Sequence, residues 1–193
     1  MYEYISGNIT ELTPAHLVIE NEGTGYFVNI SLNTYSALNG KQKSRIFLHQ
    51  VIREDAHMLF GFSEKDERDL FRLLITVSGI GANTARVMLS SLSPGEIIKA
   101  ITAGNVDVLK GVKGIGLKSA QRVILDLKDK LGKLTGSSDL HITTDNSFRE
   151  EAVSALIMLG FPKNAVEKVV SQLAADSEVA SVEDMVKRAL KKL

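Results

Sequence analysis

A short motif that could bind phosphate occurs twice near the middle of the chain. Residues 77–85 read VSGIGANTA and residues 112–120 read VKGIGLKSA. Each copy lies between two apolar stretches with helical periodicity, so each predicts a helix, a Gly-Ile-Gly hairpin and a second helix. The first backbone N–H groups of a helix have no intrahelical partner, and the helix dipole adds partial positive charge there. The repeat therefore predicts two sites for phosphate groups.

Glycines at such a turn permit a positive φ and carry no side chain that would hold a phosphate away. Ile80 and Ile115 are expected to point inward and to fix each hairpin to the core, whereas Lys118 and Arg122 stand four residues apart and share the opposite helix face. Contacts of this kind touch the nucleic-acid backbone, which predicts low sequence preference and high salt sensitivity. The candidate DNA-binding residues are Gly79, Gly81, Asn83, Thr84, Arg86, Gly114, Gly116, Lys118, Ser119 and Arg122.

The basic residues are concentrated around this repeat. The formal net charge of the chain is zero, but residues 64–133 hold twelve Lys and Arg against eight Asp and Glu. One glycine-rich turn is more often a plain helix–helix connection, whereas two tandem copies within a basic segment favour DNA. A dinucleotide site of the Rossmann type is not expected, because neither copy follows a strand or has a third glycine. There is no Walker A pattern, so no ATP site is expected either.

The elements that must position the repeat predict a multidomain α+β protein. Short apolar and β-branched runs separated by turn residues indicate a five-stranded barrel of the OB type over residues 1–63. The pattern then becomes helical over 64–134, with Ser63 as the expected N-cap and Leu70, Phe71, Leu73 and Leu74 on one apolar face. Residues 135–146 are predicted to be a flexible linker, and residues 147–193 a three-helix bundle with helices over 150–159, 163–174 and 182–193.

Composition excludes several other classes. The chain has no cysteine, which excludes disulfides and cysteine metal sites and fits a reducing cytosol. Neither a signal peptide nor a membrane span is recognisable, so a soluble cytoplasmic protein is expected. The four histidines lack metal-ligand spacing, so no metal, cofactor or catalytic residue is predicted: His16, His49, His57 and His141.

The order of these segments, and several motifs within them, are similar to the RuvA family, the Holliday junction branch-migration subunits. The likeness covers essentially the whole chain. It is carried by VIREDA at residues 51–56, LFGF at 59–62, ER followed by LF at 67–71, and KGIG with Lys118, Ser119, Ala120 and Arg122 in the second hairpin.

The resemblance implies a homotetramer that holds an open four-way junction on a concave basic face, with an octamer on DNA as an alternative. It implies that Glu54 and Asp55 form an acidic pin near the junction centre, where carboxylates repel converging phosphates; by themselves, these residues would be two solvated acids in a hairpin turn. It also implies that the C-terminal bundle, whose 159–161 turn resembles ubiquitin-associated-like bundles, contacts the RuvB motor. The RuvC resolvase is a further candidate partner.

One position departs from the family pattern. Family members often have lysine where this chain has Asn83, so Arg86 and the second hairpin are expected to carry a larger share of the contacts. Two other function classes stay open at this point. A helix-hairpin-helix nuclease or glycosylase would need a catalytic acid such as Asp126 or Asp129, and a magnesium-dependent activity assay would reveal it. A protein-interaction adaptor would bind no DNA even at low salt.

Overall fold

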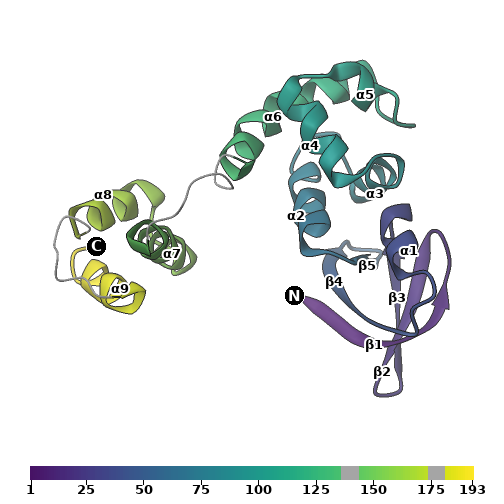
Figure 1. Ribbon diagram of the computed structural model, residues 1–193, viewed down its shortest axis with the longest axis horizontal. Helices are drawn as coiled ribbons and strands as arrows, with labels where there is room; N and C mark the ends of the chain where they lie inside the picture. Colours follow the sequence, from purple (N-terminus) through teal and green to yellow (C-terminus); the bar gives the residue numbers. More distant parts are fainter. Residues whose placement is uncertain (136–143, 174–180) are drawn as a thin grey trace. The chain divides into compact units, whose positions relative to one another are not determined.

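The computed structural model of the 193-residue chain describes residues 1–135, 144–173 and 181–193. The chain forms two compact units, Met1–Gly136 and Ser137–Leu193 (Figure 1). Within the described ranges, no helix is both long enough and apolar enough to cross a membrane.

The first unit begins with the predicted five-stranded barrel. Its strands are β1 (Tyr4–Leu12), β2 (His16–Asn21), β3 (Thr24–Ile30), β4 (Lys43–Ile52) and β5 (His57–Phe62), and they close in the order β1-β2-β3-β5-β4. The β3–β5 pair is parallel and the others are antiparallel. Alternate side chains point inward, as expected for strands with one buried face. The buried set is Leu17, Ile19, Val28, Ile30, Ile46 and Leu48.

Two elements of the barrel were not predicted. Strand β1 has no fully buried residue, and glycine and polar residues separate its few apolar ones, so its sequence carries only a weak strand signal. Helix α1 (Leu32–Leu38) is only seven residues long and is capped by the Ser31 side chain, which accepts a hydrogen bond from the Thr34 N–H. The two apolar runs at residues 45–48 and 51–52 belong to one continuous strand, β4.

Five helices complete the first unit: α2 (Lys65–Leu74), α3 (Ala82–Ser91), α4 (Pro94–Ala103), α5 (Val106–Lys110) and α6 (Leu117–Thr135). Helices α2 and α3 lie next to the barrel, with α4, α5 and α6 beyond them (Figure 1). One hydrophobic core runs from Phe60 and Phe62 of β5 through Phe71 of α2 to residues of α6. Strand β5 of the barrel therefore contributes to the core of the helices, while the barrel interior forms a second core.

The predicted N-cap of α2 was wrong by one residue. The N-cap is Glu64, which makes no side-chain cap hydrogen bond. The Ser63 N–H instead donates to Thr34 Oγ1 at 3.2 Å. The expected apolar face of α2 is confirmed, because Leu70, Phe71 and Leu74 are buried and Leu73 packs against the same core.

Glu67 of α2 is a buried acid that joins the helices to the barrel. It is 4% exposed and accepts hydrogen bonds from Ser31 Oγ at 2.5 Å and from Thr34 Oγ1 at 2.7 Å. Burial raises the pKa of the Glu67 carboxyl, and the two hydroxyl donors oppose that rise only in part. The sequence suggested only an acid in the first helical turn.

This raised pKa predicts a specific pH dependence of stability. Because the folded state binds the Glu67 proton more tightly than the unfolded state, the free energy of unfolding should fall as pH rises above the ordinary value of 4.5. The Glu67→Gln variant lacks this proton. Its stability relative to the parent chain should therefore improve by about 1.4 kcal/mol per pH unit across the window between the two pKa values. Urea unfolding of both chains between pH 4 and pH 8 measures the difference, with Glu22→Gln, at an exposed acid in the turn between β2 and β3, as control. Parallel pH profiles for Glu67→Gln and the parent chain would contradict the assignment.

The second unit contains α7 (Thr144–Met158), α8 (Lys163–Leu173) and α9 (Val182–Leu190). They enclose a small core that includes Leu156, Val166, Val170 and Met185, which confirms the predicted three-helix bundle. Gly160, with a φ of +98°, follows the end of α7. Helix α9 ends at Leu190, three residues before the predicted end.

The predicted linker cannot be followed along its whole length. Residues 136–143 lie outside the described residues, whereas residue 135 ends α6 and residues 144–146 begin α7. The ends of the predicted linker are thus helical. The predicted end of the second bundle helix, residue 174, also falls outside the described residues. The domain boundaries as a set stay predictions.

Candidate nucleic-acid interface

The two Gly-Ile-Gly turns fold in the same way. In the first hairpin (residues 75–81, between α2 and α3), Gly79 has a φ of +90° and the Ile80 N–H donates to the Val77 carbonyl oxygen at 3.0 Å. The second hairpin (residues 111–116, between α5 and α6) repeats this φ and this distance 35 positions later, at Gly114, Ile115 and Val112. The repeat in the sequence is therefore a repeat in backbone geometry.

Each hairpin leads directly into a helix whose first turn faces open space. Gly81 is the N-cap of α3, which has no side-chain cap hydrogen bond. Gly116 precedes α6, and its carbonyl accepts from the Ala120 N–H at 2.9 Å, as the Gly81 carbonyl does from the Ala85 N–H. A Cβ added at Gly81 or Gly116 would meet no atom within 4 Å. The early N–H groups of α3 and α6 are thus accessible to an anion.

Four other helices of the chain, though not α2, use a polar side chain at this place. The N-cap side chain accepts a hydrogen bond from the first turn in α1, α4, α5 and α9, where the caps are Ser31, Ser93, Asn105 and Ser181. A glycine at the start of α3 leaves those donors for a ligand. This contrast within one chain supports the hairpins as sites and not merely as turns.

The inward anchors behave as predicted. Ile80 is 4% exposed and Ile115 is 5% exposed, and both belong to the core that the helices share with the barrel. Each hairpin is therefore fixed from behind while its glycines stay exposed. The neighbouring Val77 and Val112 are buried in the same core.

The predicted polar and basic residues surround the two turns but differ in their surroundings. Asn83 and Lys118 are exposed, whereas Thr84 and Ser119 are half-buried. Within the described part of the chain, Lys118 makes no hydrogen bond or ion pair. The same is true of the exposed Lys113, which directly precedes Gly114 and which sequence reasoning quoted in the motif but did not assign to DNA.

The two predicted arginines both contact the protein itself. Arg122 of α6 donates through Nη1 to the Ser78 carbonyl oxygen at 3.5 Å and to Ser78 Oγ at 3.3 Å, so the second hairpin's helix touches the first hairpin. Arg86 of α3 donates to the Ala15 carbonyl oxygen at 2.9 Å and lies 3.5 Å from Asn29 Oδ1. The first contact places the two hairpins side by side. The second links the first hairpin's helix to the barrel.

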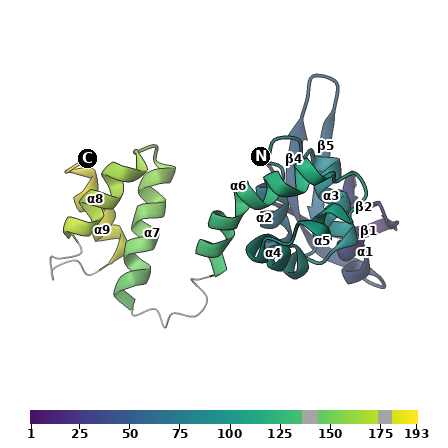
Figure 2. The same ribbon diagram turned by 90° about the horizontal axis from the view of Figure 1, so that it is seen from above.

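The predicted acidic residues lie at the tip of the β4–β5 hairpin. This hairpin projects from the barrel (Figure 2), and its turn (residues 53–56, here the acidic turn) is closed by a 2.8 Å hydrogen bond from the Arg53 N–H to the Ala56 carbonyl oxygen. Glu54 and Asp55 are exposed. Neither makes a hydrogen bond or ion pair with any described residue. Both charges are therefore presented to solvent.

Family comparisons agree with this architecture along the chain. A model of the RuvA N-terminal domain matches residues 1–61, a model of the SAM-like helix-hairpin-helix tandem matches residues 71–129, and a model of the RuvA C-terminal domain matches residues 147–193. A protein of Bacteroides fragilis is 50% identical, one of Flavobacterium psychrophilum 48% and one of Christiangramia forsetii 46%, each over 100% of both chains. All three are named "Holliday junction branch migration complex subunit RuvA". The chain belongs to the RuvA family.

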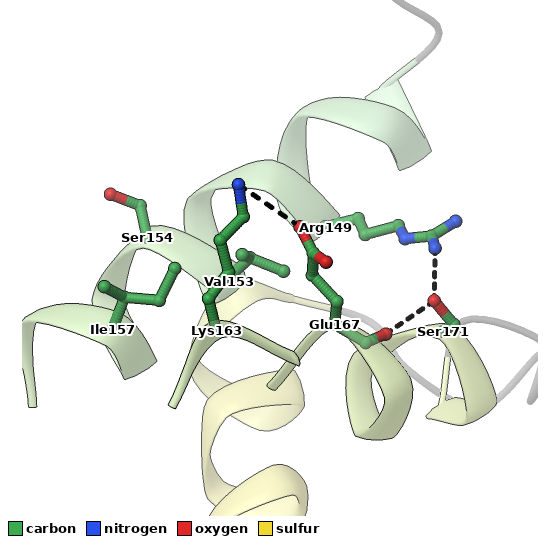
Figure 3. Close-up of a pocket in the computed structure, with 7 residues that line it drawn as sticks. All are labelled: Arg149, Val153, Ser154, Ile157, Lys163, Glu167 and Ser171. Atoms are coloured by element: carbon green, nitrogen blue, oxygen red, sulfur yellow. Dashed lines mark hydrogen bonds and ion pairs between the residues drawn. The ribbon is translucent and has the colours of Figure 1, made fainter. Parts of the chain in front are cut away.

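The RuvA C-terminal domain of this chain has a groove of about 590 Å³ between α7 and α8 (Figure 3). Its polar and charged side chains bind one another. Lys163 Nζ lies 3.6 Å from Glu167 Oε1, Arg149 donates to Ser171 Oγ, and Ser171 Oγ donates to the Glu167 carbonyl oxygen at 2.6 Å. The polar groups that line the groove are therefore already engaged within the domain.

Apolar side chains are exposed at the end of α7 instead. Met158 is 86% exposed and Leu159 is 61% exposed. Leu156 and Leu173 are buried and Val169 packs against the same core, so these apolar residues of the RuvA domain serve its core. Met158 and Leu159 do not.

The acids that the enzyme alternative would use lie on the surface of the RuvA helical region. Asp126 and Asp129, which follow the second hairpin, are both exposed on α6. Across the described residues, no three His, Cys, Asp or Glu side chains are grouped in a way that could hold a metal ion.

Proposed function

We propose that this chain binds four-way DNA junctions through their sugar-phosphate backbones, with little regard to sequence, as a non-catalytic cytoplasmic subunit of a branch-migration complex in recombination and repair. The observation that carries the proposal is the pair of hairpins with the same backbone geometry, each placing uncapped helix-start amides beside an exposed glycine. Amides of this kind bind phosphate oxygens and cannot distinguish bases. The relatives named above are described as subunits of a Holliday junction complex, which supports the four-way junction as the ligand.

Within this function, the corner glycines supply backbone donors and nearby side chains reinforce them. The exposed Asn83 adds a neutral donor at the first hairpin, and the unpaired Lys118 adds a charge at the second. The Arg122–Ser78 contact holds the two sites beside each other, so both can engage one duplex arm. The proposed DNA-contacting set comprises Gly79, Gly81, Gly114, Gly116, Asn83, Thr84, Lys113, Lys118, Ser119 and Arg122. Arg86, which the sequence placed in the same set, bonds to the barrel and supports the first hairpin from behind.

We assign the acidic turn to the centre of the junction. Glu54 and Asp55 lie at the tip of a projecting hairpin and have no cationic partner among the described residues. Their negative charges are therefore not neutralised within the protein and act on an approaching DNA backbone. Phosphates that converge at a crossover are repelled by such charges. The acidic turn would therefore disfavour a continuous duplex and keep the crossover open.

The proposed selectivity for a junction requires more than one copy of the chain. A homotetramer would present one pair of hairpins to each of four arms, so that separate weak contacts add up only on a ligand with four arms. A second tetramer on the opposite face would enclose the DNA as an octamer. The RuvC resolvase would need one face of the junction to remain open.

A binding titration at several salt concentrations tests the function. We expect a four-way junction to bind at least about tenfold more tightly than a linear duplex of equal length, because only the junction engages every subunit. The affinity should fall steeply with salt, by roughly 10³-fold or more between 50 and 200 mM if six to ten phosphates are contacted. A scrambled-sequence junction is the matched control and should bind equally well. Equal affinities for junction and duplex, or a flat salt dependence, would refute the proposal.

We further propose that the C-terminal domain binds the RuvB motor through its exposed apolar residues at the end of α7. Met158 and Leu159 offer large apolar side chains in adjacent positions, a feature typical of an interface anchor. Leu159→Ser should reduce retention of the motor on junction-bound protein by about tenfold or more, without changing junction affinity. Leu32→Ser, at an exposed leucine of the other unit, is the control. Full motor retention by the Leu159→Ser and Met158→Ser variants would contradict this assignment.

A further inference from the structure

The first hairpin's helix is fastened to the barrel at its C-terminal end. Asn33 Nδ2 of α1 donates to the carbonyl oxygens of Leu89 and Leu92 at 2.6 and 3.1 Å. The Leu32 N–H donates to Ser90 Oγ at 3.1 Å. These bonds fix the far end of α3, but they lie two turns away from the hairpin that would hold DNA.

Arg86 supplies a second fastening, closer to the hairpin. Its Nη1 donates to the Ala15 carbonyl oxygen, in the loop between β1 and β2, at 2.9 Å. The same nitrogen lies 3.5 Å from Asn29 Oδ1 in β3. Unlike Lys118, which is exposed and unpaired among the described residues, Arg86 is half-buried. Its guanidinium therefore has protein partners before any DNA arrives.

The same contact extends toward the acidic turn. Asn29 Nδ2 donates to the Leu59 carbonyl oxygen at 3.1 Å, and Leu59 lies in β5, the strand that leads away from the acidic turn. Arg86, Asn29 and Leu59 thus connect α3, β3 and β5 in sequence. Helix α3 follows the first hairpin, and strand β5 follows the acidic turn with Glu54 and Asp55. The contacts therefore link the elements that hold these two sites.

We propose that Arg86 is a positioning residue, which holds the first hairpin at a fixed place relative to the acidic turn and does not itself neutralise a phosphate. The inference deepens the proposed function and rests on it. Its importance is increased by Asn83, because the first hairpin lacks a lysine next to its glycines and depends on correctly placed amides. Backbone donors bind over a narrow range of distance and angle, whereas a long flexible lysine adapts to a shifted phosphate.

Salt dependence separates a positioning residue from a phosphate ligand. Log affinity falls linearly with log salt, and each lost phosphate contact makes this negative slope less steep by about 0.9. Lys118→Gln should lower the slope by about that amount for each subunit that contacts DNA. Arg86→Gln removes the same charge but should leave the slope at the parent value, while junction affinity falls about five- to twentyfold. Its preference for junction over linear duplex should also decrease, because the hairpin is no longer held relative to the acidic turn.

The charge-conserving variant provides a further check. Arg86→Lys keeps the charge and one donor group, but an ammonium cannot match the planar guanidinium fork. It should restore the junction affinity of Arg86→Gln only in part. Two results would identify Arg86 as a phosphate ligand and overturn the proposal. One is full junction affinity in Arg86→Lys, and the other is a salt dependence in Arg86→Gln that is as weakened as in Lys118→Gln.

Amide hydrogen exchange on the full chain without DNA tests the fastening directly. Arg86→Gln should speed exchange in the 13–16 loop and in the first turns of α3, whereas Lys118→Gln should leave both unchanged. Unchanged exchange in Arg86→Gln would overturn the proposal even if DNA binding were impaired. Because this readout contains no DNA, it remains decisive if the parent chain binds no junction, which would refute the proposed function instead.

Discussion

Replacing Gly81 and Gly116 together with valine should lower affinity for a four-way junction by about 100-fold or more while leaving the chain folded. The two glycines precede the helices whose first N–H groups are proposed to hold phosphate. A branched side chain there would occupy the open space through which a phosphate approaches. The loss should be larger than for any single side-chain variant, because the new side chains block access to backbone donors that no other residue can replace.

The fold should survive because these two positions do not require glycine. Gly81 has φ −84° and ψ 169°, an extended conformation that any residue adopts, and neither Gly81 nor Gly116 has a positive φ. An added Cβ would meet no atom within 4 Å at either position. Gly79 and Gly114 are less suitable for the test, because their φ of +90° strains any other residue.

A third glycine offers a matched control. Gly95 lies in the first turn of α4, and a Cβ there would also meet no atom within 4 Å. Gly95→Val should leave junction binding near the parent value. Fluorescence anisotropy with a labelled junction measures affinity, and circular dichroism confirms folding. Undiminished binding by a folded Gly81→Val/Gly116→Val chain would remove the physical basis of the proposed grip.

Neutralising the acidic turn should strengthen DNA binding while weakening its selectivity. The Glu54→Gln/Asp55→Asn variant removes two exposed, unpaired charges per subunit from the tip of the β4–β5 hairpin. Two unit charges about 4 Å apart interact by about 1 kcal/mol in water, and the effect falls with distance. Affinity for a linear duplex should therefore rise about tenfold, whereas affinity for an open junction should change less.

The measured quantity is the ratio of junction affinity to duplex affinity at one low salt concentration. It should fall by about tenfold in the variant, since the repulsion that excludes a continuous duplex is gone. Glu20→Gln/Glu22→Gln, at the turn between β2 and β3, removes two charges elsewhere on the barrel and serves as control. If junction affinity and duplex affinity rose equally, and by the same factor in the test variant and in the control, the acidic turn would act only through the net charge of the protein.

Several features of this protein were decided by short stretches of sequence. The two hairpins depend on glycines that adopt φ of +90° and on isoleucines that follow them, so VSGIG and KGIG were sufficient to predict both turns. Strand alternation predicted the barrel, and apolar periodicity predicted the C-terminal bundle. The acidic turn was identified by its similarity to a family motif, since two exposed acids carry no local signal of their own.

Tertiary structure alone decided which partner each polar side chain has. Arg86 bonds to Ala15, 71 residues away, Arg122 to Ser78, 44 residues away, and Glu67 to Ser31, 36 residues away. Sequence reasoning assigned both arginines to DNA and gave Glu67 no partner in the barrel. Backbone conformation is set by steric preferences within a few residues, and the sequence therefore contains it. The partner of a long side chain depends on which distant segment the closed barrel and shared core bring beside it, and no local pattern records that.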